Sequence, residues 1–396
     1  MPRRRPVIAL LLGLVLTAAA CGGSGADDGR RGPQVGVRGD EPQAAQDLGF
    51  PAFATKNTTR VGGADSIATA AAIARAVYPG VEPSTRPKAV SLIDDGNWRA
   101  GVAAAALVAD PIGAPILLSA ESDELPAATR DALAALAPTG SREAGDAQVI
   151  RIGDVPKPDG LKTTDVTGSN AFELAARIDA LLSAARGRTS DSVVVVGSER
   201  PDYAVPAAGW AAKSGDPVLF TQRDRLPAPT REALARHEQP KIYVLGGERV
   251  VSKKVEGELR RLGTVRRIDG GANPVTNAIA FARYLDGTFG WGVVDPGHGL
   301  VFVNAKRPLD AVAAAPLSAS GTYGPLLLHT GGSRLPRQLE SYLLDIQPGY
   351  RRDPVRGVYN HGWLIGDEAA VPLAVQSRID ALLEIVPVET DTSPSS

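Results

Sequence analysis

The chain has 396 residues, of which 43% are hydrophobic and 5% aromatic, and its formal net charge at pH 7 is −1. This balance is typical of a packed protein with room for two or three domains, and it argues against a strongly basic nucleic-acid-binding protein. Because Cys21 is the single cysteine, an intramolecular disulfide and a zinc site built from several thiolates are excluded.

The first twenty residues have the layout of an export signal. Three consecutive arginines precede an apolar stretch at residues 6–20, which is too short to cross a bilayer. Small residues then lead into Cys21, and this pattern resembles a bacterial lipoprotein signal, although Ala18 stands where that signal more often has leucine. The resemblance implies cleavage after residue 20, a lipid on Cys21 and a location on the outer face of the cytoplasmic membrane. Ordinary cleavage that leaves a free thiol is the alternative.

The rest of the chain is a repeat between two polar segments. Residues 21–58 are rich in Gly, Asp, Arg, Gln and Pro and predict a flexible tether, and residues 388–396 predict a frayed tail. Between them, three landmarks each occur three times, 101–109 residues apart. They are a Gly-x-Asp/Asn turn from Gly63, Gly168 and Gly271, an apolar run from Pro115, Pro217 and Pro325, and a Leu-Pro segment at Leu125, Leu226 and Leu335. We therefore predict three tandem units at residues 59–163, 164–264 and 265–387.

Each unit alternates strands and helices. In the first unit, the polar turn caps a predicted helix at residues 67–77, and a buried strand follows at 89–93. An alanine-rich helix, the apolar strand and a helix opened by the Leu-Pro segment come next, and a strand at 149–153 then leads into a closing helix. This alternation implies right-handed crossovers and parallel sheets. The predicted fold class is α/β, with three tandem Rossmann-like, doubly wound units.

The start of the first unit resembles a known repeat. Arg-Val-Gly-Gly-Ala-Asp-Ser-Ile-Ala-Thr-Ala at residues 60–70 is similar to Arg-Ile-x-Gly-x-Asp-Arg-Tyr-x-Thr-Ala, the opening motif of the second type of cell wall-binding repeat, with Ser66 in place of an arginine. The family's second landmark, an Asp-Ala pair before an alanine-rich helix, is present at Asp310, whereas the first two units have Ala100 and Tyr203 there.

This resemblance implies three repeats in a pseudo-threefold arrangement that bind anionic cell-wall polymers without a covalent bond. In such proteins a separate domain normally supplies any catalytic activity. We therefore expect a lipid-anchored protein that binds an anionic wall glycopolymer or peptidoglycan, or that acts as an envelope scaffold with protein partners. We expect it to need no cofactor or metal and to bind no nucleic acid.

Candidate ligand-binding residues follow the first strand of each unit, because ligands of parallel sheets bind beyond the carboxyl ends of the strands. Helix N-termini there favour anions, arginines add forked hydrogen bonds, and an indole ring can stack on a sugar. The candidates are Asp95, Asn97, Trp98, Arg200, Asp202, Lys306, Arg307 and Asp310. For each of them, a helix cap, a solvated loop residue or a packing residue is the alternative. For Trp210 we predict a place in the core.

Motifs for catalysis are missing from the sequence. The four histidines lack metal-ligand spacing, and neither a nucleophile elbow nor a phosphate-binding loop is present. We therefore predict a protein that is not an enzyme. The rival hypotheses are a solute-binding lipoprotein of a transporter, which should have two lobes, a hydrolase with an unrecognised site, and a module for protein–protein assembly.

Overall fold

The computed structural model describes residues 52–120, 123–271 and 273–388. The predicted signal, Cys21, most of the tether and the tail after residue 388 lie outside the described residues. In the part that the structure describes, no helix has the length and apolar character needed to cross a membrane.

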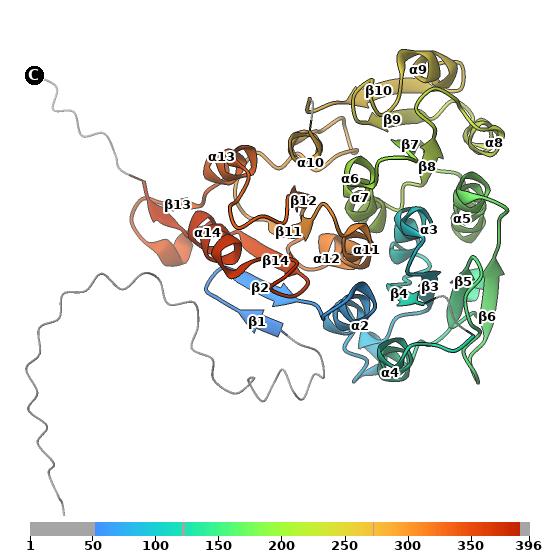
Figure 1. The fold of residues 1–396 in the computed structure, drawn as a ribbon, viewed down its shortest axis with the longest axis horizontal. Coiled ribbons are helices and arrows are strands. Elements are labelled where there is room, and N and C mark those ends of the chain that lie inside the picture. The colour runs from blue at the N-terminus through green and yellow to red at the C-terminus, as the bar shows by residue number, and fades with distance from the viewer. Residues whose placement is uncertain (1–51, 121–122, 272, 389–396) are drawn as a thin grey trace, which may run out of the picture. The chain divides into compact units, whose positions relative to one another are not determined.

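Three large parallel sheets organise the described chain (Figure 1). The first has the order β4 (Ile116–Ser119), β3 (Val90–Asp94), β5 (Val149–Ile152), β6 (Thr163–Val166). The second has the order β8 (Val218–Thr221), β7 (Ser192–Gly197), β9 (Lys241–Leu245), β10 (Thr264–Ile268). The third has the order β12 (Leu326–His329), β11 (Gly299–Asn304), β14 (His361–Ile365), β2 (Thr58–Val61), with β1 (Ala52–Ala54) antiparallel to β2. The inner strands are apolar runs buried on both faces, as parallel sheets require.

Helices cover these sheets, which confirms the predicted α/β class. In chain order they are α2 (Ser66–Val77), α3 (Trp98–Ala104), α4 (Ala127–Leu136), α5 (Ala171–Arg186), α6 (Pro201–Ala204), α7 (Pro206–Ser214), α8 (Ala228–Arg236), α9 (Lys253–Leu259), α10 (Pro274–Arg283), α11 (Pro308–Ala313), α12 (Ala315–Ala319), α13 (Arg337–Asp345) and α14 (Leu373–Leu383). The predicted caps at the unit starts are confirmed. The side chains of Asp65, Asn170 and Asn273 each accept a backbone N–H in the first turn of α2, α5 and α10.

The sheets are offset from the sequence repeat. β6 opens the second predicted unit but lies in the first sheet, and β10 opens the third unit but lies in the second sheet. β2, which opens the first unit, pairs with β14 near the end of the chain, where Arg60 lies opposite Leu364. Each unit therefore gives its first strand to the sheet of the preceding unit, and the first unit gives its strand to the last sheet.

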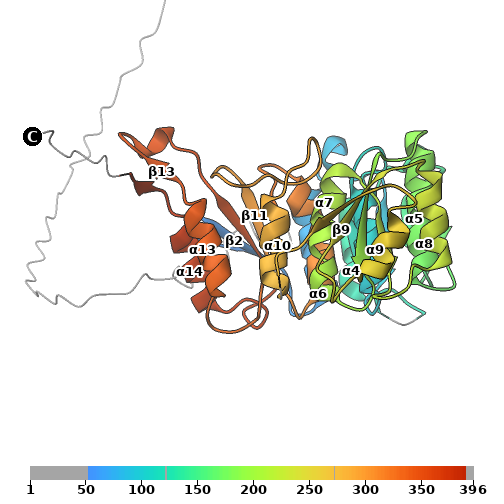
Figure 2. The ribbon, with the colours of Figure 1, turned by 90° about the horizontal axis from the view of Figure 1, so that it is seen from above.

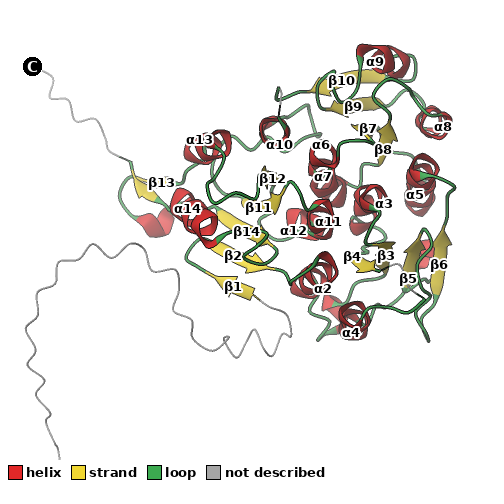
Figure 3. Cartoon of the chain, viewed as in Figure 1, coloured by secondary structure: helices red, strands yellow, loops and turns green. Residues whose placement is uncertain are grey.

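The alanine-rich helices pack between the sheets (Figure 3). Helices α3, α7, α11 and α12 contact one another, and their alanines belong to a hydrophobic core that includes side chains from all three units. Close approach explains Gly101 in α3, because a Cβ there would lie 2.5 Å from Cγ1 of Val312 in α11. The units are consequently joined by a shared core.

The predicted closing helix is absent from the first unit. α9 follows β9, and α14 follows β14, but the described residues 153–162 between β5 and β6 form turns and no helix. Pro156 and Pro158 lie in this segment, and a proline inside a helix removes a hydrogen-bond donor and clashes with the preceding turn. The prediction of a closing helix is therefore correct for the second and third units and wrong for the first.

Candidate functional site

The candidate residues follow three equivalent strands, β3, β7 and β11, and lead into α3, α6 and α11. Asn97, Arg200 and Arg307 are the N-cap residues of these helices, so they occupy the same position in each unit. Of the three, Asn97 is a true side-chain cap, and its Oδ1 accepts a hydrogen bond from the N–H of Ala100 at 3.0 Å. The two arginines form ion pairs instead.

The first loop packs against the second unit. Trp98 is 8% exposed and meets the ring of Phe220 edge-on, with 5.9 Å between ring centroids. The guanidinium of Arg99 lies 4.6 Å from the indole centroid, and its Nε donates a hydrogen bond to the carbonyl of Ser198 at 2.6 Å. Asp95 is half-buried, and its N–H donates to the carbonyl of Ser119 at 2.8 Å. Trp98 is therefore a packing residue in this arrangement, because little of its ring can reach a sugar.

The second loop is held by a local ion pair. Nη2 of Arg200 lies 2.7 Å from Oδ2 of Asp202, and the guanidinium lies 4.8 Å from the ring centroid of Tyr203. The hydrogen bond that Arg200 donates to Asp202 raises the pKa of Arg200 above its ordinary value, so this guanidinium stays charged. Nearly half of its side chain is exposed. The loop thus presents a fixed, partly neutralised cation.

The third loop joins the last unit to the first. Nε of Arg307 lies 2.7 Å from Oδ2 of Asp310, and its Nη1 donates to Oδ1 of Asp367 at 3.2 Å. Asp310 is fully buried and accepts a hydrogen bond from Oγ of Ser66 at 2.6 Å. Burial raises the pKa of Asp310, although the hydrogen bond from Ser66 and the charge of Arg307 oppose this rise. Lys306, in contrast, is exposed and forms no ion pair with any residue that the structure describes.

Sequence reasoning missed Arg60 as a structural residue. Its guanidinium is buried and donates to the carbonyls of Gly366, Asp367 and Val371 and to Oε1 of Gln376, at 2.7–3.0 Å for the Nη atoms. The signal that could have found this role is an arginine at an inward position of a buried strand, since such a charge needs partners.

Most of the exposed basic side chains in the loops after the strands lie in the second and third units, at Arg200, Arg223, Arg225, Arg249, Lys306 and Arg334. The first unit has Lys157 in the connection after β5. Many of the neighbouring carboxylates are already held in ion pairs, namely Asp202, Asp224, Glu248 and Asp367. The corresponding loops of the first unit carry carboxylates at Asp94, Asp95, Asp123, Glu124 and Asp154. Among described residues, no three His, Cys, Asp or Glu side chains are grouped to hold a metal ion.

A family model and two named relatives match parts of this chain. The model of cell wall binding domain 2 matches residues 166–256, which lie within the second predicted unit. The amidase enhancer of Bacillus subtilis (strain 168) is 32% identical over 179 residues, covering 45% of this chain and 23% of the relative. The N-acetylmuramoyl-L-alanine amidase LytC of the same strain is 29% identical over 218 residues, covering 52% of this chain and 40% of the relative. The chain thus spans less than half the length of these relatives.

Two solved structures share the fold. Cwp8 from Clostridium difficile matches with a TM-score of 0.62 and 21% identity, covering 83% of this chain and 52% of that protein. Cwp6 from the same organism matches with a TM-score of 0.66 and 18% identity, covering 85% of this chain and 51% of that protein. The resemblance seen in the sequence is confirmed: residues 166–256 match cell wall binding domain 2, and the chain shares the fold of Cwp8 and Cwp6.

Proposed function

We propose that this protein binds an anionic polymer of the bacterial cell wall without a covalent bond and without catalysis. The cell wall binding domain 2 match at residues 166–256 carries the proposal. The two relatives from B. subtilis are named as an amidase enhancer and an amidase, and the shared segment covers 23% and 40% of them. A shared minor part of two differently named proteins supports a common binding role better than a common reaction.

The proposed contact surface is formed by the strand-end loops of the second and third units. Arg249, Lys306 and Arg334 are exposed there and form no ion pair with any other described residue, so their charges are available to phosphate or carboxylate groups. Arg200 adds a guanidinium at the same end of the second sheet. Asn97, Trp98, Arg307 and Asp310 support this surface by fixing the loops and the unit junctions.

A lipid on Cys21 would hold this surface on the outer face of the cytoplasmic membrane, next to the wall. We include this anchor in the proposal because of the sequence around Cys21. Metabolic labelling with palmitate tests it: label in the parent chain and none in Cys21→Ser is the expected result. Equal labelling of both chains, or of neither, would rule out this anchor.

Cosedimentation with purified walls tests polymer binding. We expect the protein to sediment with intact walls and to stay in solution with walls whose anionic polymers have been extracted by acid. The triple variant Arg249→Glu, Lys306→Glu, Arg334→Glu should bind on the order of ten- to a hundredfold more weakly, at up to about 1 kcal/mol for each exposed charge. Raising the salt concentration should weaken binding of the parent protein.

The matched control reverses three charges at the opposite ends of the strands. Lys162, Arg188 and Lys241 precede or begin β6, β7 and β9 and are exposed, and their triple replacement by glutamate changes the net charge equally. The control variant should bind like the parent. Equal loss in both variants would mean that net charge alone drives binding, and equal binding to extracted walls would remove the anionic polymer as the ligand.

A further inference from the structure

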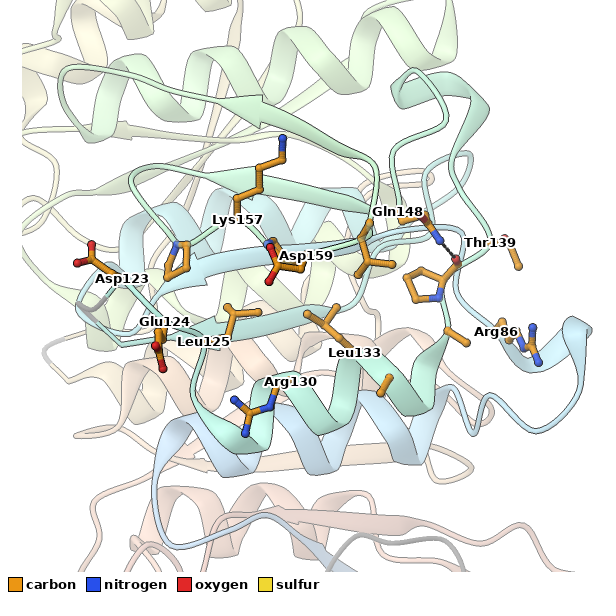
Figure 4. Close-up of a pocket in the computed structure, with 16 residues that line it drawn as sticks. Arg86, Asp123, Glu124, Leu125, Arg130, Leu133, Thr139, Gln148, Lys157 and Asp159 are labelled. Atoms are coloured by element: carbon orange, nitrogen blue, oxygen red, sulfur yellow. Dashed lines mark hydrogen bonds between the residues drawn. The ribbon is translucent and has the colours of Figure 1, made fainter.

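The first unit contains a cavity of about 830 Å³ between α4 and the connection from β5 to β6 (Figure 4). Leu125, Leu133 and Ala134 line it from α4 and from the segment that leads into α4, and Lys157 and Asp159 line it from the connection between β5 and β6. Leu125 is partly buried against a small hydrophobic cluster that is separate from the main core. The cavity therefore lies at the edge of an incompletely covered satellite core.

The other two units have a helix at the equivalent place. α8 and α13 correspond to α4, because all three follow the Leu-Pro segment. α9 is connected to α8 by a side-chain ion pair and buries Val255 and Leu259, which are four residues apart. α14 lies beside α13 and buries Val375 and Ile379 with the same spacing (Figure 2). This spacing places the two apolar side chains on one face of a helix.

One position marks the contact between these helices in every unit. Arg130, Arg231 and Glu340 each lie five residues after the leucine of the Leu-Pro segment. Nη2 of Arg231 lies 3.3 Å from Oε2 of Glu258 in α9, and Glu340 forms an ion pair with Arg378 of α14. The charges are exchanged between the two units, but the pairing with the closing helix is the same.

In the first unit this position is a cation with no partner on the described chain. Arg130 is exposed, lines the cavity and forms no ion pair with a residue that the structure describes. The connection between β5 and β6 buries Val155 but cannot continue as a helix through Pro156 and Pro158. The groove thus has the apolar lining of a helix-binding site and the charge of Arg130 at its rim, but no helix of the described chain occupies it.

We propose that this groove receives an amphipathic α-helix of a partner protein, in the place that α9 and α14 take in their own units. The helix presents two apolar residues four apart to Leu125 and Leu133, and a carboxylate to Arg130. In helix-in-groove recognition of this kind, apolar side chains at helical spacing bind in the groove, and charged side chains pair at its rim. The inference adds a protein-binding site and does not depend on the proposed polymer binding.

The chain supplies its own probe for this site. A fluorescent peptide of residues 250–262 contains α9, with Val255, Leu259 and the carboxylate of Glu258. Fluorescence anisotropy with the purified full chain should show saturable binding of this peptide. Ala134→Trp should abolish it, because Ala134 is exposed and a larger side chain there fills the groove without entering the core.

Charge exchange tests the predicted register. Arg130→Glu should weaken binding of the peptide about threefold or more, and a peptide carrying Glu258→Arg should recover affinity for Arg130→Glu, because the pair Glu340–Arg378 has this polarity. Arg142→Glu reverses an exposed charge outside the groove and should leave binding unchanged. Circular dichroism of each variant checks that the fold is retained.

Three results would overturn the proposal. The first is no saturable binding at peptide concentrations up to about 1 mM. The second is binding that neither Ala134→Trp nor Arg130→Glu affects, since the peptide would then bind elsewhere. The third is that the peptide binds a chain that lacks residues 22–51 but does not bind the full chain. In that case this chain's own N-terminal segment would be the occupant of the groove.

Discussion

At the scale of single residues, burial and a nearby buried charge lower the pKa of a histidine at the junction of the first and last units. Arg60 is held inside by three backbone carbonyls and Gln376. His329, at the carboxyl end of β12, is buried and accepts a hydrogen bond from the N–H of Gly331 at its Nδ1, at 3.0 Å. Burial, and then the charge of Arg60, lower the pKa of His329 to about 4. This histidine is therefore neutral in the folded protein at neutral pH.

Replacing His329 should reduce the acid sensitivity of the fold. Because the pKa is lower in the folded chain than its ordinary value of 6.5, the stability from this group is complete above pH 6.5 and is lost as the pH falls toward 4. The loss is on the order of 3 kcal/mol between pH 7 and pH 4. Urea unfolding at pH 7, 5.5 and 4 should show a smaller decrease in the free energy of unfolding for His329→Gln than for the parent. Parallel decreases would show that other groups cause the acid loss.

At the scale of elements, the connection between α10 and β11, which belongs to the third unit, packs against the second unit. Phe289 in this connection stacks on Tyr243 of β9, with ring centroids 3.4 Å apart, and lies 5.0 Å from the ring centroid of Trp210 in α7. Trp291 packs edge-on against Trp210. The prediction that Trp210 belongs to the core is confirmed, since it is 3% exposed. The connection between α10 and β11, for which the sequence predicts no helix or strand, thus contributes buried rings to the packing between the second and third units.

Truncation of Phe289 should therefore destabilise the protein severely. Phe289→Ala removes a buried ring between two units and should lower the free energy of unfolding by about 3–5 kcal/mol, whereas Phe289→Leu should cost less because it leaves a smaller cavity. Val294→Ala is the matched control, since Val294 follows in the same connection and is exposed. Chemical denaturation measures all three variants. A cost for Phe289→Ala no larger than for Val294→Ala would show that the connection does not hold the units together.

The accuracy of sequence-based prediction also differs between elements. Strands such as β7 and helices such as α2 carry their pattern locally, in an apolar run or in a cap followed by helical spacing, so both were predictable. The prediction of a closing helix in the first unit rests on the repeat alone, and Pro156 and Pro158 prevent a helix there. The candidate loops were placed correctly at the strand ends, but the partners of Asp310 and Arg307 lie 244 and 60 residues away in the sequence. Such partners depend on tertiary contacts that periodicity does not encode.

At the scale of the whole described chain, the fold closes through β2, which lies near the start of the described residues. β2 pairs with β14, and side chains beside it bind the end of α14: Nδ2 of Asn57 donates to the carbonyl of Asp380 at 3.0 Å, and Lys56 forms an ion pair with Glu384. β10 has the same place beside β9 but follows it directly through α9. The third sheet thus has the topology of the second, except that its last strand comes from the opposite end of the chain. A solute-binding protein with two hinged lobes gains no support from this arrangement, because the core includes residues from all three units.

Moving β2 behind α14 should preserve the fold, whereas removing it should not. The permuted chain begins at Gly62 and carries residues 52–61 after Val388 through a short Gly/Ser linker, which the contacts between Lys56 and Glu384 allow. It should unfold cooperatively with nearly the parent's free energy and retain wall binding. Deletion of residues 52–61 removes β1, β2 and the buried Arg60, and should cost more than about 3 kcal/mol. Urea unfolding compares the three chains. If the permuted chain were as unstable as the deletion, closure would require the natural connection from β2 to α2; if the deletion were as stable as the parent, β2 would not complete the third sheet.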